Sequence, residues 1–185
     1  YSLSPYTPEE IVARKFLVEE RPDVILNIVD GTNIERNLYL SLQIMETGVP
    51  TVLALNMMDE VEKRGIKIDA EGLAKSLGVT VVPIIARSGK GIPELMVAVA
   101  DTIKTGKKPA ELELYKKARE ADLKEASDSY DPEEVKADLR YTFIGELSSK
   151  YVVKPLEESI GVETTSDKMD KILTNRWLAL PIFAL

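Results

Sequence analysis

The chain carries three short apolar runs, at residues 24–29, 51–55 and 80–85. Between the first two runs, Leu38, Leu42 and Met45 recur at helical spacing, so a helix is expected to connect two strands. Strands that alternate with helices in this way predict a parallel sheet. Because all three runs are apolar on both faces, helices should cover both sides of the sheet.

The segments between and beyond these runs predict the helices. They are expected at about residues 7–20, 34–47, 70–77, 92–104, 110–126 and 132–148, with a short helix from 166. The first begins with a capping box, in which Thr7 is the N-cap and Glu10 completes the box. Beyond Gly106 the pattern is helical, with no obvious strand. The fold class is therefore α/β, a parallel sheet with flanking helices, followed by a small all-α helical domain.

The composition restricts the chemistry that this chain can perform. It has 185 residues, a net charge of −7, and neither cysteine nor histidine. A thiol nucleophile, a disulfide framework and the commonest general base and metal ligand are thereby excluded. The acidic balance argues against a nucleic-acid partner, whose binding surface would be basic and clustered. Any catalysis must use carboxylates, backbone dipoles, Lys or Arg, or a bound ion.

The last nine residues, 177–185, contain no charge. A membrane-spanning helix needs about 20 apolar residues, so this segment is too short to cross a bilayer. Trp177 directly follows Arg176, as expected where a helix enters a membrane. We therefore expect the start of a membrane-spanning segment that is cut short, and the alternative is an apolar tail packed on the core. The N-terminus has no basic segment followed by an apolar one, so no signal peptide is expected.

The second apolar run ends in a candidate guanine reader, Asn56-Met57-Met58-Asp59. An Asp carboxylate can accept from the two adjacent N–H donors on the edge of guanine, and adenine lacks that pair. The Asn amide can tie this loop to a neighbouring nucleotide-binding loop. Met57 can supply apolar contact over the base, or it can simply fill the core. The four-residue pattern is common by chance, but the end of a parallel strand is where α/β sheets bind ligands.

The third run leads into a second candidate loop, Ala86-Arg87-Ser88. Its backbone N–H groups could face the guanine carbonyl oxygen, whereas the simpler interpretation is an ordinary strand-to-helix turn. Asp30 and Thr32 also follow a strand, and we expect them to cap the next helix. The spacing of a phosphate loop, G-x-x-x-x-G-K-[ST], occurs nowhere in the chain. The sequence thus contains the base-reading half of a nucleotide site without the phosphate half.

Four further segments indicate a family, and the stretches at 35–40 and 170–176 are the specific ones. They are Tyr-Ser-Leu-Ser-Pro-Tyr at 1–6, Asn-Ile-Val-Asp at 27–30, Glu-Arg-Asn-Leu-Tyr-Leu at 35–40 and Ser-Asp-Lys-Met-Asp-Lys-Ile-Leu-Thr-Asn-Arg at 166–176. Together with Ala-Leu-Asn-Met-Met-Asp at 54–59, they closely resemble the cytosolic part of the ferrous iron transport protein B family. The resemblance covers nearly the whole chain.

The resemblance implies a partial P-loop GTPase-type fold in three parts. Residues 1–106 would be the C-terminal part of the GTPase domain, 107–174 a helical domain that slows nucleotide release, and 175–185 the start of the first transmembrane segment. The intact protein would be a GTPase of the inner membrane that couples GTP binding and hydrolysis to Fe²⁺ uptake, with this region in the cytoplasm. Its partners would be GTP or GDP and its own transmembrane domain, and a homo-oligomer is left open.

The same resemblance assigns residues to a nucleotide site. Asn56, Met57 and Asp59 match the guanine-specificity motif, and Ala86, Arg87 and Ser88 match the second base-contacting loop, where Ala86 can contribute only its main chain. The tail of a mobile switch segment would be formed by Tyr1, Ser2, Leu3 and Ser4. The phosphate loop, the Mg²⁺ ligands and any K⁺-binding residue would lie upstream, so no catalytic or metal-binding residue is assigned in this chain. Alone, the segment should bind GTP poorly and hydrolyse it negligibly.

Two other interpretations stay open. A soluble GTPase acting on the ribosome or on RNA would have the same base-reading loops, although the acidic balance and the absence of a basic patch weigh against it. A non-catalytic helical adaptor on a membrane protein would retain a degenerate nucleotide fold. Titration of Asp59→Ala with guanine and xanthine nucleotides separates these interpretations, and no loss of guanine preference would favour the adaptor.

Overall fold

The computed structural model describes residues 12, 15–17, 19–20, 22–112, 114, 116–117 and 132–155. The chain divides into two compact units, residues 1–153 and 154–185, and every element described below belongs to the first. The switch residues 1–4, most of the helices expected at 7–20 and 110–126, the one from 166, and the apolar tail lie outside the described residues. The domain boundaries expected at 106 and 174 stay a prediction.

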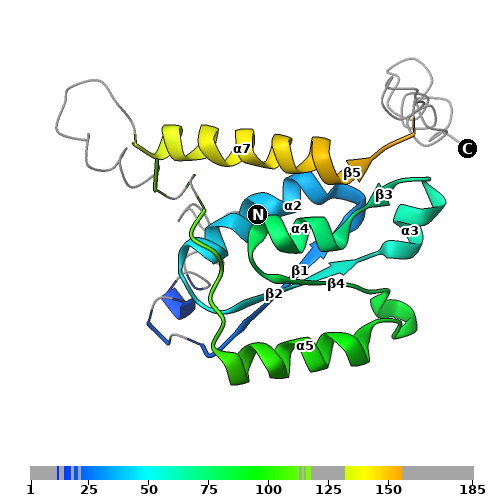
Figure 1. Cartoon of the computed structure of the whole chain (residues 1–185), viewed down its shortest axis with the longest axis horizontal. Helices are drawn as coiled ribbons and strands as arrows, with labels where there is room; N and C mark the ends of the chain where they lie inside the picture. Colours follow the sequence, from blue (N-terminus) through cyan, green and yellow to red (C-terminus); the bar gives the residue numbers. More distant parts are fainter. Residues whose placement is uncertain are drawn as a thin grey trace, which may run out of the picture. The chain divides into compact units, whose positions relative to one another are not determined.

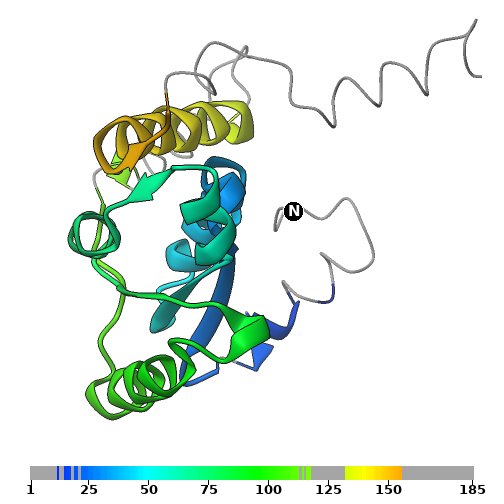
Figure 2. The ribbon, with the colours of Figure 1, turned by 90° about the vertical axis from the view of Figure 1, so that its right-hand side faces the viewer.

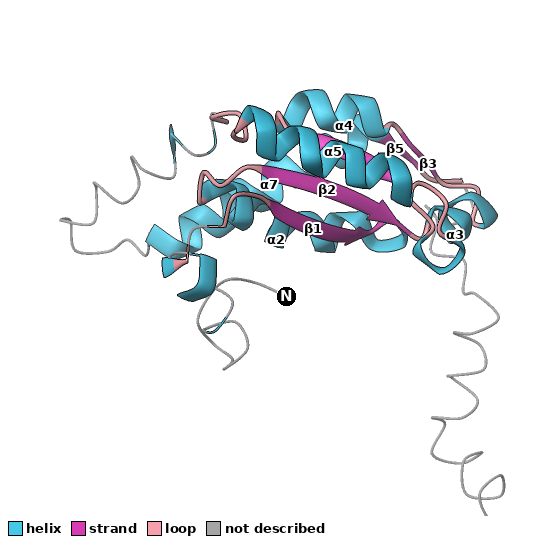
Figure 3. Cartoon of the chain, turned by 90° about the horizontal axis from the view of Figure 1, so that it is seen from below, coloured by secondary structure: helices cyan, strands magenta, loops and turns pink. Residues whose placement is uncertain are grey.

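Three parallel strands form the central sheet, as the apolar runs predict. They are β1 (Ile25–Asp30), β2 (Thr51–Asn56) and β4 (Thr80–Pro83), in the order β1-β2-β4 (Figure 1). The strands β1 and β2 run side by side (Figure 3). The register places Asp30 beside Asn56 and Leu55 beside Pro83. The polar residues that end the strands are therefore gathered at one edge of the sheet, which is where parallel sheets bind ligands.

Helices pack on both faces of the sheet. The helices α2 (Ile34–Glu46) and α4 (Ala70–Leu77) cover one face, and α5 (Ile92–Thr105) covers the other (Figures 1 and 2). The expected coverage of both faces is correct for β2 and β4 but wrong for β1, where the side chains of Leu26 and Ile28 are 41% and 62% exposed. The reason is that α5 lies against β2 and β4.

The charged stretch after Asp59 contains two elements that the sequence pattern did not predict. It forms the short helix α3 (Met58–Lys63) and the two-residue strand β3 (Lys67–Ile68). The strand β3 pairs antiparallel with β5 (Val152–Val153), so the expectation of no strand beyond Gly106 is wrong. A two-residue strand is too short to show alternation, and its partner is far away in the sequence.

A long helix, α7 (Pro132–Tyr151), packs against α2 and α4 on the side away from the sheet (Figure 1). Its Ile144 and Leu147 join the same buried cluster as Leu38 and Leu42 of α2. Among the described residues, thirteen buried side chains make up this cluster, so the contact between the helical segment and the sheet domain is part of the main core.

A buried ion pair fixes α7 to the end of α2. The guanidinium of Arg140, with a side chain 5% exposed, donates two hydrogen bonds of 2.7 Å to the Glu46 carboxylate. Burial by itself lowers the pKa of Arg140, but the hydrogen bonds and charge of Glu46 outweigh burial and raise the pKa above its usual value. A second link joins the same helices where Ser148 donates a 2.6 Å hydrogen bond to Glu35.

Tyr151, the last residue of α7, packs its ring on Gly72 of α4. The Tyr151 hydroxyl is 2.7 Å from the Ser76 hydroxyl of α4, and its backbone oxygen accepts from the Asp69 N–H at 2.9 Å. A Cβ added to Gly72 would lie only 2.2 Å from the Tyr151 ring, so only glycine lets this ring pack on the first turn of α4.

We predict that Gly72→Ala lowers the free energy of unfolding by about 1–3 kcal/mol, the usual cost of forcing an extra carbon into a packed site. Gly145→Ala is the matched control, because Gly145 lies inside α7 with nothing within 4 Å of the added carbon. There Ala should stabilise the helix by up to about 1 kcal/mol. Urea unfolding of the protein measures both, and equal effects of the two substitutions would contradict the packing argument.

Candidate functional site

The backbone turns sharply where β2 ends. Met57 adopts a left-handed conformation with φ of 64°, and it is the only non-glycine residue with positive φ in the described part of the chain. For an ordinary L-residue this conformation costs about 1–2 kcal/mol. The turn directs the chain from Asn56 into α3 and places Asp59 in the first turn of that helix. Strain of this kind is typical of a functional site, where neighbouring contacts hold it in place.

The two loops expected to read a base lie side by side. The Asn56 side-chain oxygen accepts a 3.0 Å hydrogen bond from the backbone N–H of Ala86, which begins the 3-10 turn η2 (Ala86–Ser88). Backbone bonds reinforce the contact, since Ile84 donates to Leu55 at 2.8 Å and Met58 donates to Ile84 at 3.4 Å. The expectation that the Asn amide ties this loop to a neighbouring one is confirmed.

Asp59 and Arg87 face each other across this junction. One Arg87 guanidinium nitrogen forms an ion pair with the Asp59 Oδ2 atom and lies 4.0 Å from the Glu60 carboxylate. The Asp59 side chain is 18% exposed, whereas that of Arg87 is 70% exposed. The buried Oδ2 atom receives no hydrogen bond of good geometry from the described residues, although it has this charged neighbour. Asp59 thus retains capacity to accept hydrogen bonds.

The remaining expected site residues are Met57 and Ser88. Met57 is 40% exposed on the turn, where its side chain is accessible to a ligand. The Ser88 hydroxyl donates to the Ile85 carbonyl at 3.2 Å and so stabilises its own turn. The structure therefore groups Asn56, Met57 and Asp59 with Ala86 and Arg87, while Ser88 uses its hydroxyl within the loop.

The residues that follow β1 pack against this junction. The Asp30 carboxylate accepts from the Thr32 N–H at 2.8 Å and from the Thr32 hydroxyl at 2.7 Å, which confirms the expected capping role at η1 (Gly31–Asn33). A Cβ on Gly31 would lie 3.0 Å from the Asn56 carbonyl oxygen and 2.9 Å from a Val61 methyl group. Sequence reasoning missed Gly31 as a supporting residue, although a glycine directly after a strand-ending Asp was the available signal.

The described residues contain no group of three or more acidic side chains placed to hold a metal ion. Within the same part of the chain, none of the helices has the length and apolar character needed to span a membrane. The junction provides the Asp59 carboxylate, backbone N–H groups and the accessible apolar side chain of Met57. This arrangement suits a flat, polar-edged base, and its selectivity would come from hydrogen bonds.

A parallel sheet with flanking helices and two joined loops at its carboxyl edge is the architecture of a GTPase G-domain. The model of the family described as "Ferrous iron transport protein B" matches residues 1–99, and the chain belongs to this family.

Relatives and solved structures agree with this assignment. A Helicobacter pylori Fe(2+) transporter FeoB is 35% identical over 185 residues, covering 99% of this chain and 26% of its own length. A Porphyromonas gingivalis fusion of Fe(2+) transport protein A with FeoB is 56% identical over 96 residues, covering 51% of this chain and 11% of the fusion. The chain thus spans about a quarter or less of the length of these relatives.

The FeoB G-domain of Methanococcus jannaschii is 49% identical, with a TM-score of 0.55 over 56% of this chain and 67% of that one. A GDP-bound variant of the S. thermophilus protein is 29% identical, with a TM-score of 0.71 over 83% of this chain and 78% of that one. The cytosolic domain of L. pneumophila FeoB is 27% identical, with a TM-score of 0.68 over 83% of this chain and 77% of that one.

Proposed function

We propose that this chain supplies the guanine-reading loops and the helical part of the cytosolic region of a ferrous iron transporter. In the intact protein, GTP binding and hydrolysis would be coupled to Fe²⁺ uptake. The observation that carries the proposal is the 3.0 Å hydrogen bond from Ala86 N–H to the Asn56 side chain, which holds two loops as one base-binding unit. The GDP bound to the S. thermophilus relative supports the same ligand class.

In this proposal each site residue has a separate role toward guanine. Asp59 accepts the two adjacent N–H donors on the guanine edge, while the backbone N–H of Arg87 faces its carbonyl oxygen, because the N–H groups of Ala86 and Ser88 already donate to Asn56 and Ile85. Met57 lies over the face of the base. Guanine would displace Arg87 from Asp59, because the base needs the buried Asp59 Oδ2 atom that Arg87 now faces. Because the Arg87 side chain is 70% exposed, water screens its charge and the pair contributes about 0–1 kcal/mol, so its release costs little.

The phosphate half of the site would come from sequence upstream of residue 1. The exposed apolar side chains Leu26 and Ile28 on β1 support this proposal, because a further helix and strand would cover them. The phosphate loop, the Mg²⁺ ligands and any K⁺ site would belong to that upstream segment. Residues 1–4 would then be the tail of a switch, and the chain alone would not turn over GTP at a useful rate.

The helical segment would relay the nucleotide state toward the membrane. Support comes from its two attachments, Arg140 to Glu46 on α2 and β5 to β3. We propose that residues 107–174 form a helical domain that slows nucleotide release, and that 175–185 begin the first transmembrane segment in the inner membrane. This region would face the cytoplasm.

Asn56→Ala provides the test of the base-binding unit. Loss of the tie to Ala86 should weaken GDP binding by about tenfold, since one such hydrogen bond is worth roughly 1–1.5 kcal/mol. Calorimetry on the complete cytosolic region, with GDP and ADP, measures this loss. The matched control is Asn37→Ala, because the Asn37 side chain on α2 donates a 3.0 Å hydrogen bond to the Asn33 carbonyl, and its loss should leave GDP affinity unchanged.

Two results would contradict the proposal. Equal affinity of the wild type for GDP and ADP would exclude guanine reading, because an unpaired buried carboxylate should reject adenine by at least about 100-fold. Unchanged Fe²⁺ uptake by cells that carry the full transporter with Asn56→Ala, despite weakened GDP binding, would exclude the coupling to iron.

A further inference from the structure

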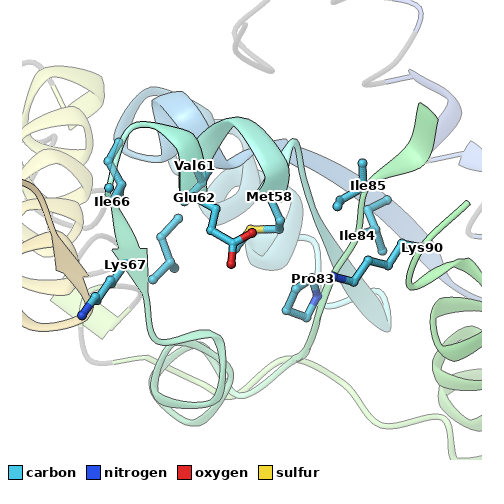
Figure 4. Close-up of a pocket in the computed structure, with 11 residues that line it drawn as sticks. Met58, Val61, Glu62, Ile66, Lys67, Pro83, Ile84, Ile85 and Lys90 are labelled. Carbon is cyan, nitrogen blue, oxygen red and sulfur yellow. The ribbon is translucent and has the colours of Figure 1, made fainter. Parts of the chain in front are cut away.

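Behind the base-reading loops lies a cavity of about 470 Å³ (Figure 4). It opens between α3 with the following turn on one side and the end of β4 with the start of the 85–90 loop on the other. Its lining is mainly apolar, from Met58, Val61, Ile66, Pro83, Ile84 and Ile85. Binding sites for small molecules usually measure about 300–1,000 Å³ and are lined mostly by apolar groups, so this cavity has the size and character of one.

Three charged side chains also line the cavity. Glu62 and Lys90 reach into the space from its two sides, and Lys67 lies at its far end (Figure 4). None of the three side chains has a hydrogen bond or ion pair with another residue among those that the structure describes. An ammonium group beside apolar walls gains most from an anionic partner, and Glu62 can accept from a hydroxyl or an amine.

We infer that this cavity is a binding site for a small amphiphilic anion, a molecule with an apolar body and one acidic group. The apolar body would fill the space over Val61 and Ile84, and the acidic group would meet Lys90. Two lysines against one glutamate give the lining a net positive charge, which favours an anion over a cation.

The site would also influence the nucleotide, a consequence that rests on the function proposed above. Met58 lies between Met57 and Asp59, and it donates to Ile84 on the opposite wall. Ile85 and Lys90 close the second base loop, since the Ile85 N–H donates to the Lys90 carbonyl at 2.9 Å.

The far wall of the cavity includes Ile68 of β3, which pairs with Val152 at the end of the helical segment. A ligand in the cavity therefore touches the backs of both base-reading loops and the attachment of the helical segment. Binding that shifts these walls must change guanine-nucleotide affinity, and by linkage the nucleotide must change the affinity for the ligand.

The test uses 8-anilinonaphthalene-1-sulfonate, an apolar aromatic anion whose fluorescence rises in apolar sites, on the complete cytosolic region. We expect saturable binding that Lys90→Ala weakens by about fivefold, the loss for one partly exposed charge pair of about 1 kcal/mol. Glu62→Phe should abolish binding, because a ring at this position on α3 fills the cavity. Lys104→Ala, the same charge change on an exposed lysine of α5, should bind the probe like the wild type.

The second measurement is GDP affinity by calorimetry with and without saturating probe, where a change of at least about threefold is expected for a coupling of typical size. Equal probe binding by the wild type, Lys90→Ala and Glu62→Phe would overturn the site. No saturable signal from the wild type would overturn it too, since the cavity would then be filled by another part of the chain. Cavity-dependent probe binding without a change in GDP affinity would overturn the coupling, whereas absence of any GDP binding would overturn only the proposed function.

Discussion

Replacing Asp59 by Asn should transfer the nucleotide preference of the complete cytosolic region from guanine to xanthine. The Asp59 carboxylate can only accept hydrogen bonds, as the two N–H donors of guanine require. An Asn amide adds an N–H donor, which repels the guanine amino group and suits the carbonyl that xanthine has there. Two charge-assisted bonds are worth about 1.5–3 kcal/mol each, so GDP affinity should fall by about 100-fold or more. Calorimetry with GDP and XDP measures the transfer.

Arg87→Ala is the matched control for this experiment, because it removes the partner of Asp59 and keeps the carboxylate. Its GDP affinity should rise by no more than about fivefold, since an ion pair with one solvent-exposed partner, here Arg87, contributes at most about 1 kcal/mol. If Asp59→Asn kept the full preference for GDP over XDP, Asp59 would not be the base reader. That outcome would favour the adaptor with a degenerate nucleotide fold.

Glu46→Gln should destabilise the folded protein by about 3 kcal/mol, because removing one member of a buried ion pair leaves the other charge uncompensated. Arg140 is the charge left behind, with a side chain only 5% exposed and two of its hydrogen bonds directed at Glu46. Its guanidinium stays protonated, so it cannot avoid the cost by losing its charge. Urea unfolding of the cytosolic region measures the change in the free energy of unfolding.

Two further variants make this experiment specific. Asp101→Asn disrupts an exposed pair with Lys104, whose side chains are 65% and 76% exposed, and should change stability by less than about 0.5 kcal/mol. The double variant Glu46→Leu with Arg140→Met replaces both charges by apolar groups and should cost less than Glu46→Gln alone. A single substitution no more harmful than Asp101→Asn would show that the pair does not hold α7 in place.

The positions of the base-reading loops followed from the sequence because the sheet is parallel. Apolar runs fixed the three strands, and parallel strands must bring their carboxyl ends to one edge. Asn56 and Ala86, which lie 30 positions apart in the chain, therefore meet by topology rather than by local propensity. The same reasoning placed Asp30 at a strand end and identified its capping role.

What the sequence pattern missed depends on contacts between distant residues. The cavity needs Glu62 and Lys90 on opposite walls, and the ion pair of Arg140 needs Glu46 at a distance of 94 positions. Neither has a periodic signature, because each member alone is an ordinary polar residue of a helix or loop. The left-handed Met57 was also missed, since a methionine carries no signal for positive φ and tertiary contacts impose it.

The exposed side of β1 has a consequence for how this polypeptide behaves in solution. Within the described residues, β1 hydrogen-bonds to one neighbouring strand only, and Leu26 and Ile28 extend beside that free edge. An edge strand with unpaired backbone groups and apolar side chains is a template on which a second copy can add its own strand. Self-association would therefore compete for the surface that upstream sequence would otherwise cover. Aggregation should therefore increase with concentration wherever this strand is uncovered, and covering it should keep the protein monomeric.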